Sequence, residues 1–379
     1  MKNKKNILLA LTTAHHGLYR GVARYAREHD WHLVTDMLYA ANIPYGWRGD
    51  GIISHVGYWN ELADFIRSAK EPRVELTNVR PDIDVPHVEG DNHQIGEIAA
   101  QHFLERGYRN FAWAPFTDDI INKHRYEGFC EKLNNNGFDC TILPPQHHLS
   151  GTPLRIDWSG HLKILKNKIL KLPKPLAIFC YNDCVAANVL HACQQAEILV
   201  PEQVALVGTD NDELLCEAVT VSLTSVMHDL EGIGYQGAML LDQQIDKLTI
   251  PSEFILVPPK GIAVRQSSDM LAVSNLQVAH ALSYIWNNYM NPSLTVDKIV
   301  MATKLSRRPL EIAFRRETGR TINDEIIRVR LEKVKDMLKN TDMSVVDIAT
   351  ATGFTRANHL YRTFRKHFGI TPRTFQAKL

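Results

Sequence analysis

The sequence of 379 residues predicts an α/β region of two layered lobes followed by an all-helical domain. Short apolar runs alternate with amphipathic helical stretches up to roughly residue 265, a pattern typical of βαβ units and parallel sheets. From about Leu276 onward the pattern becomes almost entirely helical. The charge changes at the same place: residues 1–275 hold 25 Lys and Arg against 33 Asp and Glu, whereas residues 276–379 hold 18 against 9. An acidic body and a basic tail indicate a polyanionic partner for the tail.

The first part contains a regular series of predicted elements. We expect strands at Asn6–Leu11, Trp31–Leu38, Gly51–His55, Arg73–Asn78, His87–Glu89, Asn110–Ala114, Ala177–Tyr181 and Val204–Gly208. We expect helices at Gly17–His29, Glu61–Lys70, His93–Arg106, Arg125–Asn136 and Asp183–Ala196. So many βα units favour two lobes over one sheet.

The chain length also requires more than one domain. We expect an α/β domain at residues 1–270, a linker at 271–276 and a helical domain at 277–379. Within the α/β domain, we assign lobe 1 to about 1–115 and 229–250, and lobe 2 to about 116–228 and 251–268.

The helical part contains an internal repeat. The segment Lys298–Ser306 aligns with Asp347–Thr355 at an offset of 49 residues, and one extra residue then pairs Leu310 with Leu360 and Phe314 with Phe364. Each copy reads as a helix, a turn and a second helix. Two helix-turn-helix motifs therefore lie in tandem, joined by an amphipathic stretch at Asn323–Lys339.

The second helix of each copy buries one apolar face and turns polar residues outward. Ser306 and Thr355 occupy the positions where N-caps are expected. An α-helix fits the major groove, where Arg, Asn and Glu make base-specific hydrogen bonds. Basic residues that would reach phosphates instead are Arg315, Arg316, Arg365, Lys366 and Arg373. The alternative is a helical domain with a solvated charged face.

The tail resembles the DNA-binding domain of AraC-family regulators. The resemblance rests on IATATGF, HLYRTFRKHFGITPRTF and the preceding RVRLEKVKDMLKNTDMSVVDIA. It implies base-reading roles for Arg308, Glu311 and Ile312 in copy one, and for Ala357, Asn358, His359 and Arg362 in copy two. The chain departs from the family pattern at Lys304, where Gly is common, at the apolar Ile312, and at Gln376, where Arg is usual.

The body resembles the effector domain of lactose-repressor-type regulators and periplasmic sugar-binding proteins. The segments that carry the resemblance are VEGDNHQIGEIAAQHFLERGYRNFAW, RYEGF, IFCYNDCVAANVL and VPEQVALVGTDNDE. The order of the two modules is similar to that of the xylose operon regulatory protein family. This resemblance implies a periplasmic-binding-protein-like sensor whose DNA binding is controlled by a small sugar such as xylose.

A sugar needs hydrogen-bonding partners for its hydroxyls and an aromatic face for its C–H surface, and ligands of open α/β sheets bind at the carboxyl ends of the strands. The candidate ligand-binding residues are His15, His16, Asp91, Arg125, Asp183 and Asp210, and the candidate stacking rings are Trp113, Phe116 and Tyr181. Asp91 and Asp210 are equally compatible with helix capping, and the two histidines with a polar turn.

Other functions are suggested by weaker motifs. Gly232–Gly237 matches GxGxxG and would suggest an NAD-dependent oxidoreductase, but the motif continues at helical spacing instead of following a strand. The start MKNKKNILLALTTA would suggest an exported sugar-binding protein, but its apolar run is shorter than the ~7–15 residues of a signal sequence. Neither alternative accounts for residues 276–379.

The remaining composition favours a protein of the cytoplasm. The six Cys residues form no CxxC and are expected to be reduced thiols. We expect no metal, no cofactor, no enzymatic activity and no membrane span. The expected partners are double-stranded DNA, a small sugar, a second copy of the chain in a homodimer and, for an activator, RNA polymerase.

Overall fold

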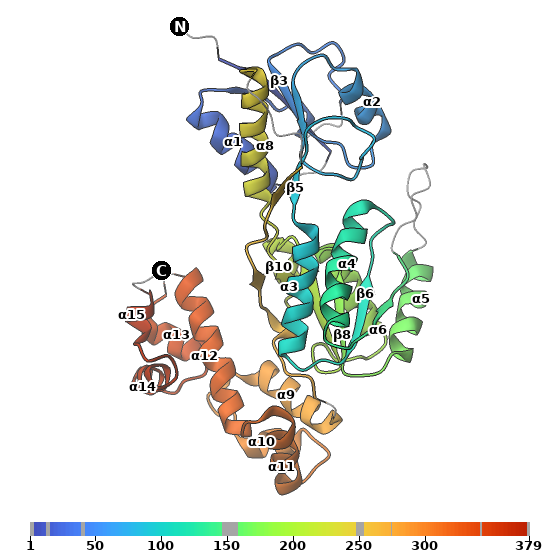
Figure 1. The fold of residues 1–379 in the computed structure, drawn as a ribbon. Coiled ribbons are helices and arrows are strands. Elements are labelled where there is room, and N and C mark those ends of the chain that lie inside the picture. The colour runs from blue at the N-terminus through green and yellow to red at the C-terminus, as the bar shows by residue number, and fades with distance from the viewer. Residues whose placement is uncertain are drawn as a thin grey trace. The chain divides into compact units, whose positions relative to one another are not determined.

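The computed structural model describes residues 4–12, 16–38, 42–145, 158–247, 254–273, 275–341 and 343–376. The chain divides into two compact units, Met1–Asp269 and Met270–Leu379 (Figure 1). The first unit is α/β and consists of two lobes, and the second is entirely helical in the part that is described. Among the described residues, no helix is both long enough and apolar enough to cross a membrane.

Lobe 1 is built on a parallel sheet with the strand order β2-β1-β3-β4. Its strands are β1 (Asn6–Leu11), β2 (His32–Val34), β3 (Gly51–His55) and β4 (Arg73–Glu75). Its helical segments are α1 (His16–Glu28), η1 (Asp36–Leu38), α2 (Asn60–Ser68) and α8 (Leu230–Ile245). The central strand β1 is an unbroken apolar run because both of its faces are covered.

Alternate residues of β1 serve different cores. Ile7, Leu9 and Leu11 pack in the core formed with α1 and α8, whereas Leu8 and Ala10 pack in the core formed with α2. In Figure 1 the yellow α8 lies beside the blue α1, although the two helices are far apart in sequence. The glycines of the GxGxxG run lie inside α8, where a Cβ at Gly234 would come within 2.1 Å of the Leu18 carbonyl oxygen. The run serves close helix packing, as its spacing predicts.

Lobe 2 is built on a sheet with the order β12-β10-β9-β8-β6-β7, in which only the pairing of β12 with β10 is antiparallel. Its strands are β6 (Asn110–Ala114), β7 (Cys140–Ile142), β8 (Leu176–Cys180), β9 (Val204–Thr209), β10 (Thr224–Val226) and β12 (Ile262–Ala263). Its helices are α3 (Asn92–Glu105), α4 (Ile120–Asn134), α5 (Trp158–Lys171), α6 (Asp183–Gln195) and α7 (Glu213–Ala218), and η2 (Gln266–Ser268) follows β12. The apolar faces of α5 and α6 pack on one side of the sheet.

The chain crosses between the lobes three times. A two-stranded parallel pair of β5 (Val88–Gly90) and β11 (Ile255–Val257) lies at two of the crossings, and residues 227–229 form the third. The predicted limit of lobe 1 at about residue 115 is wrong, because β6 pairs with β8 and α3 packs against α4. The change of lobe lies next to β5 instead.

The second unit contains two small helical cores. The first core unites α9 (Leu276–Asn288), α10 (Val296–Met301), α11 (Arg307–Thr318) and the start of α12 (Ile322–Asn340). The second unites the rest of α12 with α13 (Val345–Ala351), α14 (Ala357–Phe368) and α15 (Pro372–Gln376). The repeat pairs Leu310 with Leu360 and Phe314 with Phe364, and all four side chains are fully buried.

The helical unit differs from the sequence prediction in two places, at the N-caps of α11 and α14 and in the predicted linker. Ser306 is the N-cap of α11 but makes no side-chain capping hydrogen bond, and α14 is preceded by Arg356 at the N-cap instead of Thr355. Met270 and Val273 are buried in the first core of the second unit. The segment 271–276 is therefore only partly a linker, since part of it packs with the helices that follow.

Candidate functional site

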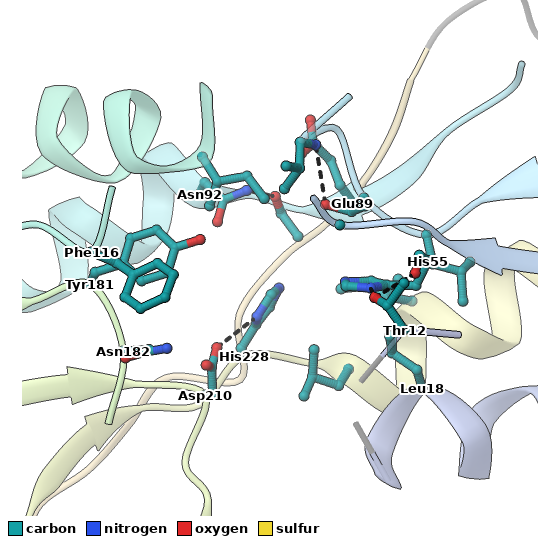
Figure 2. Close-up of a pocket in the computed structure, with 18 of the residues that line it drawn as sticks. Thr12, Leu18, His55, Glu89, Asn92, Phe116, Tyr181, Asn182, Asp210 and His228 are labelled. Atoms are coloured by element: carbon teal, nitrogen blue, oxygen red, sulfur yellow. Dashed lines mark hydrogen bonds and ion pairs between the residues drawn. The ribbon is translucent and has the colours of Figure 1, made fainter. Parts of the chain in front are cut away.

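A cavity of about 610 Å³ lies between the two lobes of the first unit. Its walls come from the loops at the carboxyl ends of the parallel strands and from the crossing segments (Figure 2). Lobe 1 contributes lining residues between Thr12 and Val79 together with Leu230 and Ile233 of α8. Lobe 2 contributes lining residues between Asn92 and Asp210, and the crossings add Glu89, Gly90 and His228. The volume lies within the usual range for sites that enclose a small molecule.

Arg125 is the most buried basic group of the cavity wall, with a fractional exposure of 3%. Its Nε donates to the side-chain oxygen of Asn92 at 2.9 Å, and a terminal nitrogen donates to the carbonyl of Tyr181. Its other terminal nitrogen lies 3.7 Å from Oδ1 of Asp210, and the guanidinium lies 4.8 Å from the centre of the Tyr181 ring. These contacts hold the planar guanidinium in one orientation.

Asp210 joins this network to the crossing at residues 227–229. Its Oδ1 lies 3.2 Å from Nδ1 of His228. Asp210 and the following Asn211 have φ values of 99° and 54°, in a region that residues with side chains seldom occupy. Two such residues in succession carry backbone strain that is common at binding sites. A Cβ at Gly90 would lie 2.0 Å from Nε2 of His228, so only glycine leaves room for this ring.

Aromatic rings supply the apolar part of the wall. Phe116 and Tyr181 stack with their ring centres 5.6 Å apart and their planes inclined by 23°. Tyr58 and Trp59 contribute from lobe 1. Trp113, a predicted stacking ring, is instead buried in the core of lobe 2 and does not line the cavity, because β6 directs it toward Phe179.

The predicted ligand-binding residues occupy different places. Arg125 and Asp210 line the cavity. Asp91 does not, and its side chain caps α3 by accepting from the backbone N–H of Gln94 at 2.9 Å. His16 is exposed at the start of α1 and is not part of the wall, and His15 lies outside the described residues.

Asp183 is buried behind the wall. Its Oδ2 accepts from the backbone N–H of Asp212 at 2.9 Å, and burial together with the nearby Asp210 raises its pKa to about 7. It is not part of the cavity wall, whereas the preceding Asn182 is. Asp183 thus supports the strained loop that carries Asp210.

The predicted helix at Arg125–Asn136 in fact begins at Ile120, so Arg125 lies in its second turn.

Several polar groups of the wall were not predicted. They are Thr12, His55, Thr77, Glu89, Asn92, Asn182 and His228. Thr12 follows β1, and its hydroxyl donates to the carbonyl of His55 at 2.8 Å. Thr12, His55, Thr77 and Asn182 lie at or just beyond the end of a parallel strand. Applying the strand-end argument to every strand would have found them.

The predicted DNA-binding residues lie on the outer surface of the second unit. Those on α11 and α15 are exposed, as are those on α14 except Ala357, which is half-buried against the second core. Ile312 is 60% exposed, which is unusual for an isoleucine on a helix with a solvated face. Glu311 is paired with Arg307 at 2.9 Å, so its carboxylate is already held by a basic neighbour.

Two family models match the two parts of the chain. A periplasmic binding protein-like domain matches residues 100–268, and a helix-turn-helix domain matches residues 299–378. The chain is similar to the xylose operon regulatory protein of Escherichia coli (strain K12), at 27% identity over 94% of this chain and 92% of the relative. The chain is a DNA-binding transcription regulator whose architecture is similar to that of the xylose operon regulatory proteins.

Further comparisons agree with this architecture. The xylose operon regulatory protein of Haemophilus influenzae (strain ATCC 51907 / DSM 11121 / KW20 / Rd) is 28% identical over 77% of this regulator and 74% of the relative. The solved structure of the xylose-binding transcription activator xylR has the same fold, with a TM-score of 0.81, 24% identity and coverage of 100% and 99%. The structure of the transcriptional regulator CelR with cellobiose matches with a TM-score of 0.56, at 20% identity, over 70% of this regulator and 86% of that chain. The predicted fold class, a sensor of two α/β lobes followed by a tandem helix-turn-helix domain, is confirmed.

Proposed function

We propose that the regulator binds a neutral pentose, D-xylose or a close relative, in the cavity between its two lobes, and that this binding controls how its helical unit binds DNA. The observation that carries the proposal is the buried network of Arg125, Asn92, Asp210 and His228 around a cavity with a stacked aromatic wall. Fixed donors and acceptors match sugar hydroxyls, and aromatic faces match the C–H surface of a sugar ring. The names of the relatives supply the choice of xylose.

The cavity has walls from both lobes, and the lobes are joined by three crossings that permit a hinge movement. A sugar that contacts both lobes favours the closed arrangement, because only that arrangement makes all of its contacts at once. Closing also removes the sugar from water and strengthens its hydrogen bonds.

The helical unit supplies the DNA contacts. The net charge of residues 276–379 is +9 from 18 basic and 9 acidic residues, which favours binding to phosphates. We propose that Arg308, Glu311, Ile312, Ala357, Asn358, His359 and Arg362 face the bases and that Arg315, Arg316, Lys366 and Arg373 face phosphates. We further propose that the regulator acts in the cytoplasm as a homodimer and contacts RNA polymerase where it activates transcription.

Two measurements on the full chain test the proposal. Thermal melting with D-xylose, other pentoses and hexoses is expected to show a rise in the first unit's melting temperature, by about 5 °C or more at a hundredfold excess over Kd. Electrophoretic mobility shifts on DNA from upstream of a sugar-catabolic operon are expected to change when the same sugar is added. The proposal fails if no sugar stabilises the protein, or if the stabilising sugar leaves DNA binding unchanged.

A further inference from the structure

Glu89 lies on β5, at the first crossing between the lobes, and lines the cavity (Figure 2). Its strand is paired with β11, where Glu89 is opposite Leu256, so its backbone position is fixed by both crossing strands. The residue is 4% exposed. A carboxylate is thus held in the wall of the site, on a segment that joins the two lobes.

One oxygen of this carboxylate has no donor within the part of the chain that the structure describes. The side chain of Asn78 hydrogen-bonds to Glu89. Oε2 of Glu89, however, is buried without a hydrogen-bond partner among the described residues. Burial raises the pKa of Glu89 to about 7, against the opposing effects of Asn78 and the positive charge of Arg125. An acceptor that is buried without a donor is costly, and such groups in native proteins commonly await a ligand or water.

A second buried glutamate shows how this protein satisfies a carboxylate that has no ligand to bind. Glu75 of β4 is fully buried, and its two oxygens accept from the hydroxyl of Ser54 and, at 2.9 Å, from the backbone N–H of Val56. Burial raises its pKa to about 7 as well. Glu75 does not line the cavity. The two residues therefore differ in the feature that matters, which is whether a protein donor occupies each oxygen.

We propose that Glu89 is a specificity-determining residue of the sugar site, whose Oε2 accepts a hydrogen bond from a sugar hydroxyl. This inference rests on the proposed function. A hydroxyl supplies the missing donor, whereas a deoxy position leaves the oxygen unsatisfied and an acidic sugar brings a second negative charge to it. The site is therefore selective for a neutral sugar that carries a hydroxyl at this position, over its deoxy and acidic analogues.

The proposal predicts a pH dependence with a definite sign. A hydroxyl donor stabilises the ionised carboxylate, so binding lowers the pKa of Glu89 from its value of about 7 in the free protein. Affinity is then highest at a pH well above 7 and falls as the pH drops through 7, by up to about tenfold from pH 8 to pH 6. Arg125 and Asp91 act on Glu89 through their charges, and the other titratable groups of the cavity wall are His55, Tyr58, Tyr181, Asp210 and His228. All of them remain in a Glu89 variant, so the difference from wild type isolates Glu89.

Calorimetric titration of the full chain with D-xylose, L-arabinose, D-ribose and D-xylulose at pH 6 and pH 8 tests this. For the sugar that binds wild type most tightly, Glu89→Gln is expected to lose about tenfold or more in affinity at pH 8 and to lose the pH dependence. Glu89→Asp, which keeps the charge but withdraws it by one methylene, is expected to weaken binding while keeping the pH dependence. Glu75→Gln is the matched control and is expected to bind as wild type does.

The outcomes separate this inference from the proposed function. If none of the four sugars binds wild type, the pentose proposal and the role of Glu89 are both overturned. If wild type binds a sugar and Glu89→Gln keeps both its affinity and its pH dependence, only the role of Glu89 is overturned. An equal loss in Glu75→Gln would also overturn it, since the effect would then follow from removing any buried carboxylate. Should Glu89→Gln fail to melt cooperatively, Glu89→Asp decides: unchanged affinity for the sugar contradicts the proposal.

Discussion

Nδ1 of His228 lies 3.2 Å from Oδ1 of Asp210, and this pair joins a crossing segment to the wall of lobe 2. The same carboxylate oxygen lies 3.7 Å from Arg125 on α4. Asp210 therefore connects the hinge region and a helix of lobe 2 at one atom. Any ligand that hydrogen-bonds to Asp210 changes the environment of both neighbours, which makes this residue a natural link between binding and lobe movement.

Asp210→Asn is expected to weaken sugar binding by about 10- to 100-fold, because the amide keeps the shape but removes the charge that holds Arg125 and His228. Calorimetry with the sugar that binds wild type measures the change. Asp212→Asn is the matched control: Asp212 lies two residues away, caps α7 through the backbone N–H of Leu215 and does not line the cavity. Wild-type affinity in Asp210→Asn would contradict the assignment.

Tyr58→Phe is expected to weaken sugar binding by about 2- to 10-fold, mainly through faster dissociation. The Tyr58 hydroxyl of lobe 1 donates to the carboxylate of Asp119, the N-cap of α4 in lobe 2. This hydrogen bond between the lobes exists only when they are close together, so its loss favours opening. Stopped-flow measurement of the dissociation rate checks the prediction.

The control for this change is Tyr45→Phe, at an exposed tyrosine of lobe 1 whose ring lies beside Phe65. It removes the same atom from the same lobe without affecting a contact between lobes. A dissociation rate that rises equally in both variants would show that the Tyr58 hydroxyl has no special part in closure.

The sequence predicted the alternation of strands and helices well, because each buried strand is an apolar run and each helix has a periodic apolar face. The tandem repeat was also readable, since Leu310 and Leu360 are core positions at a fixed offset, and both are fully buried. The lobe boundary was not readable in this way. The pairing of β6 with β8 joins segments 66 residues apart in register, from Asn110 to Leu176, and apolar runs do not specify their partners.

The cavity wall was only partly predictable for a related reason. The predicted residues Arg125 and Asp210 line the cavity, but Asp91 and Asp183 use their carboxylates on backbone N–H groups of nearby loops and helices. From sequence, a capping aspartate and a ligand-binding aspartate look alike. Glu89 and His228 lie on crossing segments, whose position depends on how the two lobes are joined.

Arg362→Ala is expected to reduce binding to the preferred DNA site by about 1–3 kcal/mol and to relax sequence preference, whereas Arg373→Ala weakens binding to all sequences alike. Arg362 is exposed in the middle of α14, and Arg373 is exposed on the short α15 that follows. Mobility shifts of the full chain on a specific fragment and on a scrambled fragment measure both effects. Equal losses on both fragments for both variants would rule out this division of roles.

Ser268→Ala is expected to uncouple DNA binding from the sugar while leaving sugar affinity unchanged. Ser268 lies two residues before Met270, where the helical unit begins. Two contacts hold it to the C-terminal end of α3 in lobe 2. Its hydroxyl lies 2.7 Å from Nε2 of His102, and its carbonyl accepts from Nε of Arg106 at 2.9 Å. Burial lowers the pKa of His102 to about 3, so this imidazole is neutral at physiological pH and the contact is not an ion pair.

Because this segment is fixed to lobe 2, a movement of lobe 2 is passed to the residue where the helical unit begins. Removing the hydroxyl leaves the buried His102 nitrogen unsatisfied, at a cost of about 1–3 kcal/mol, and loosens that attachment. The sugar-dependent change in DNA affinity is expected to shrink severalfold in mobility shifts, with an unchanged Kd for the sugar by calorimetry. Ser68→Ala removes a comparable hydrogen bond to the carbonyl of Phe65 in lobe 1 and is expected to keep the full response. A full response in Ser268→Ala as well would show that coupling does not pass through this segment.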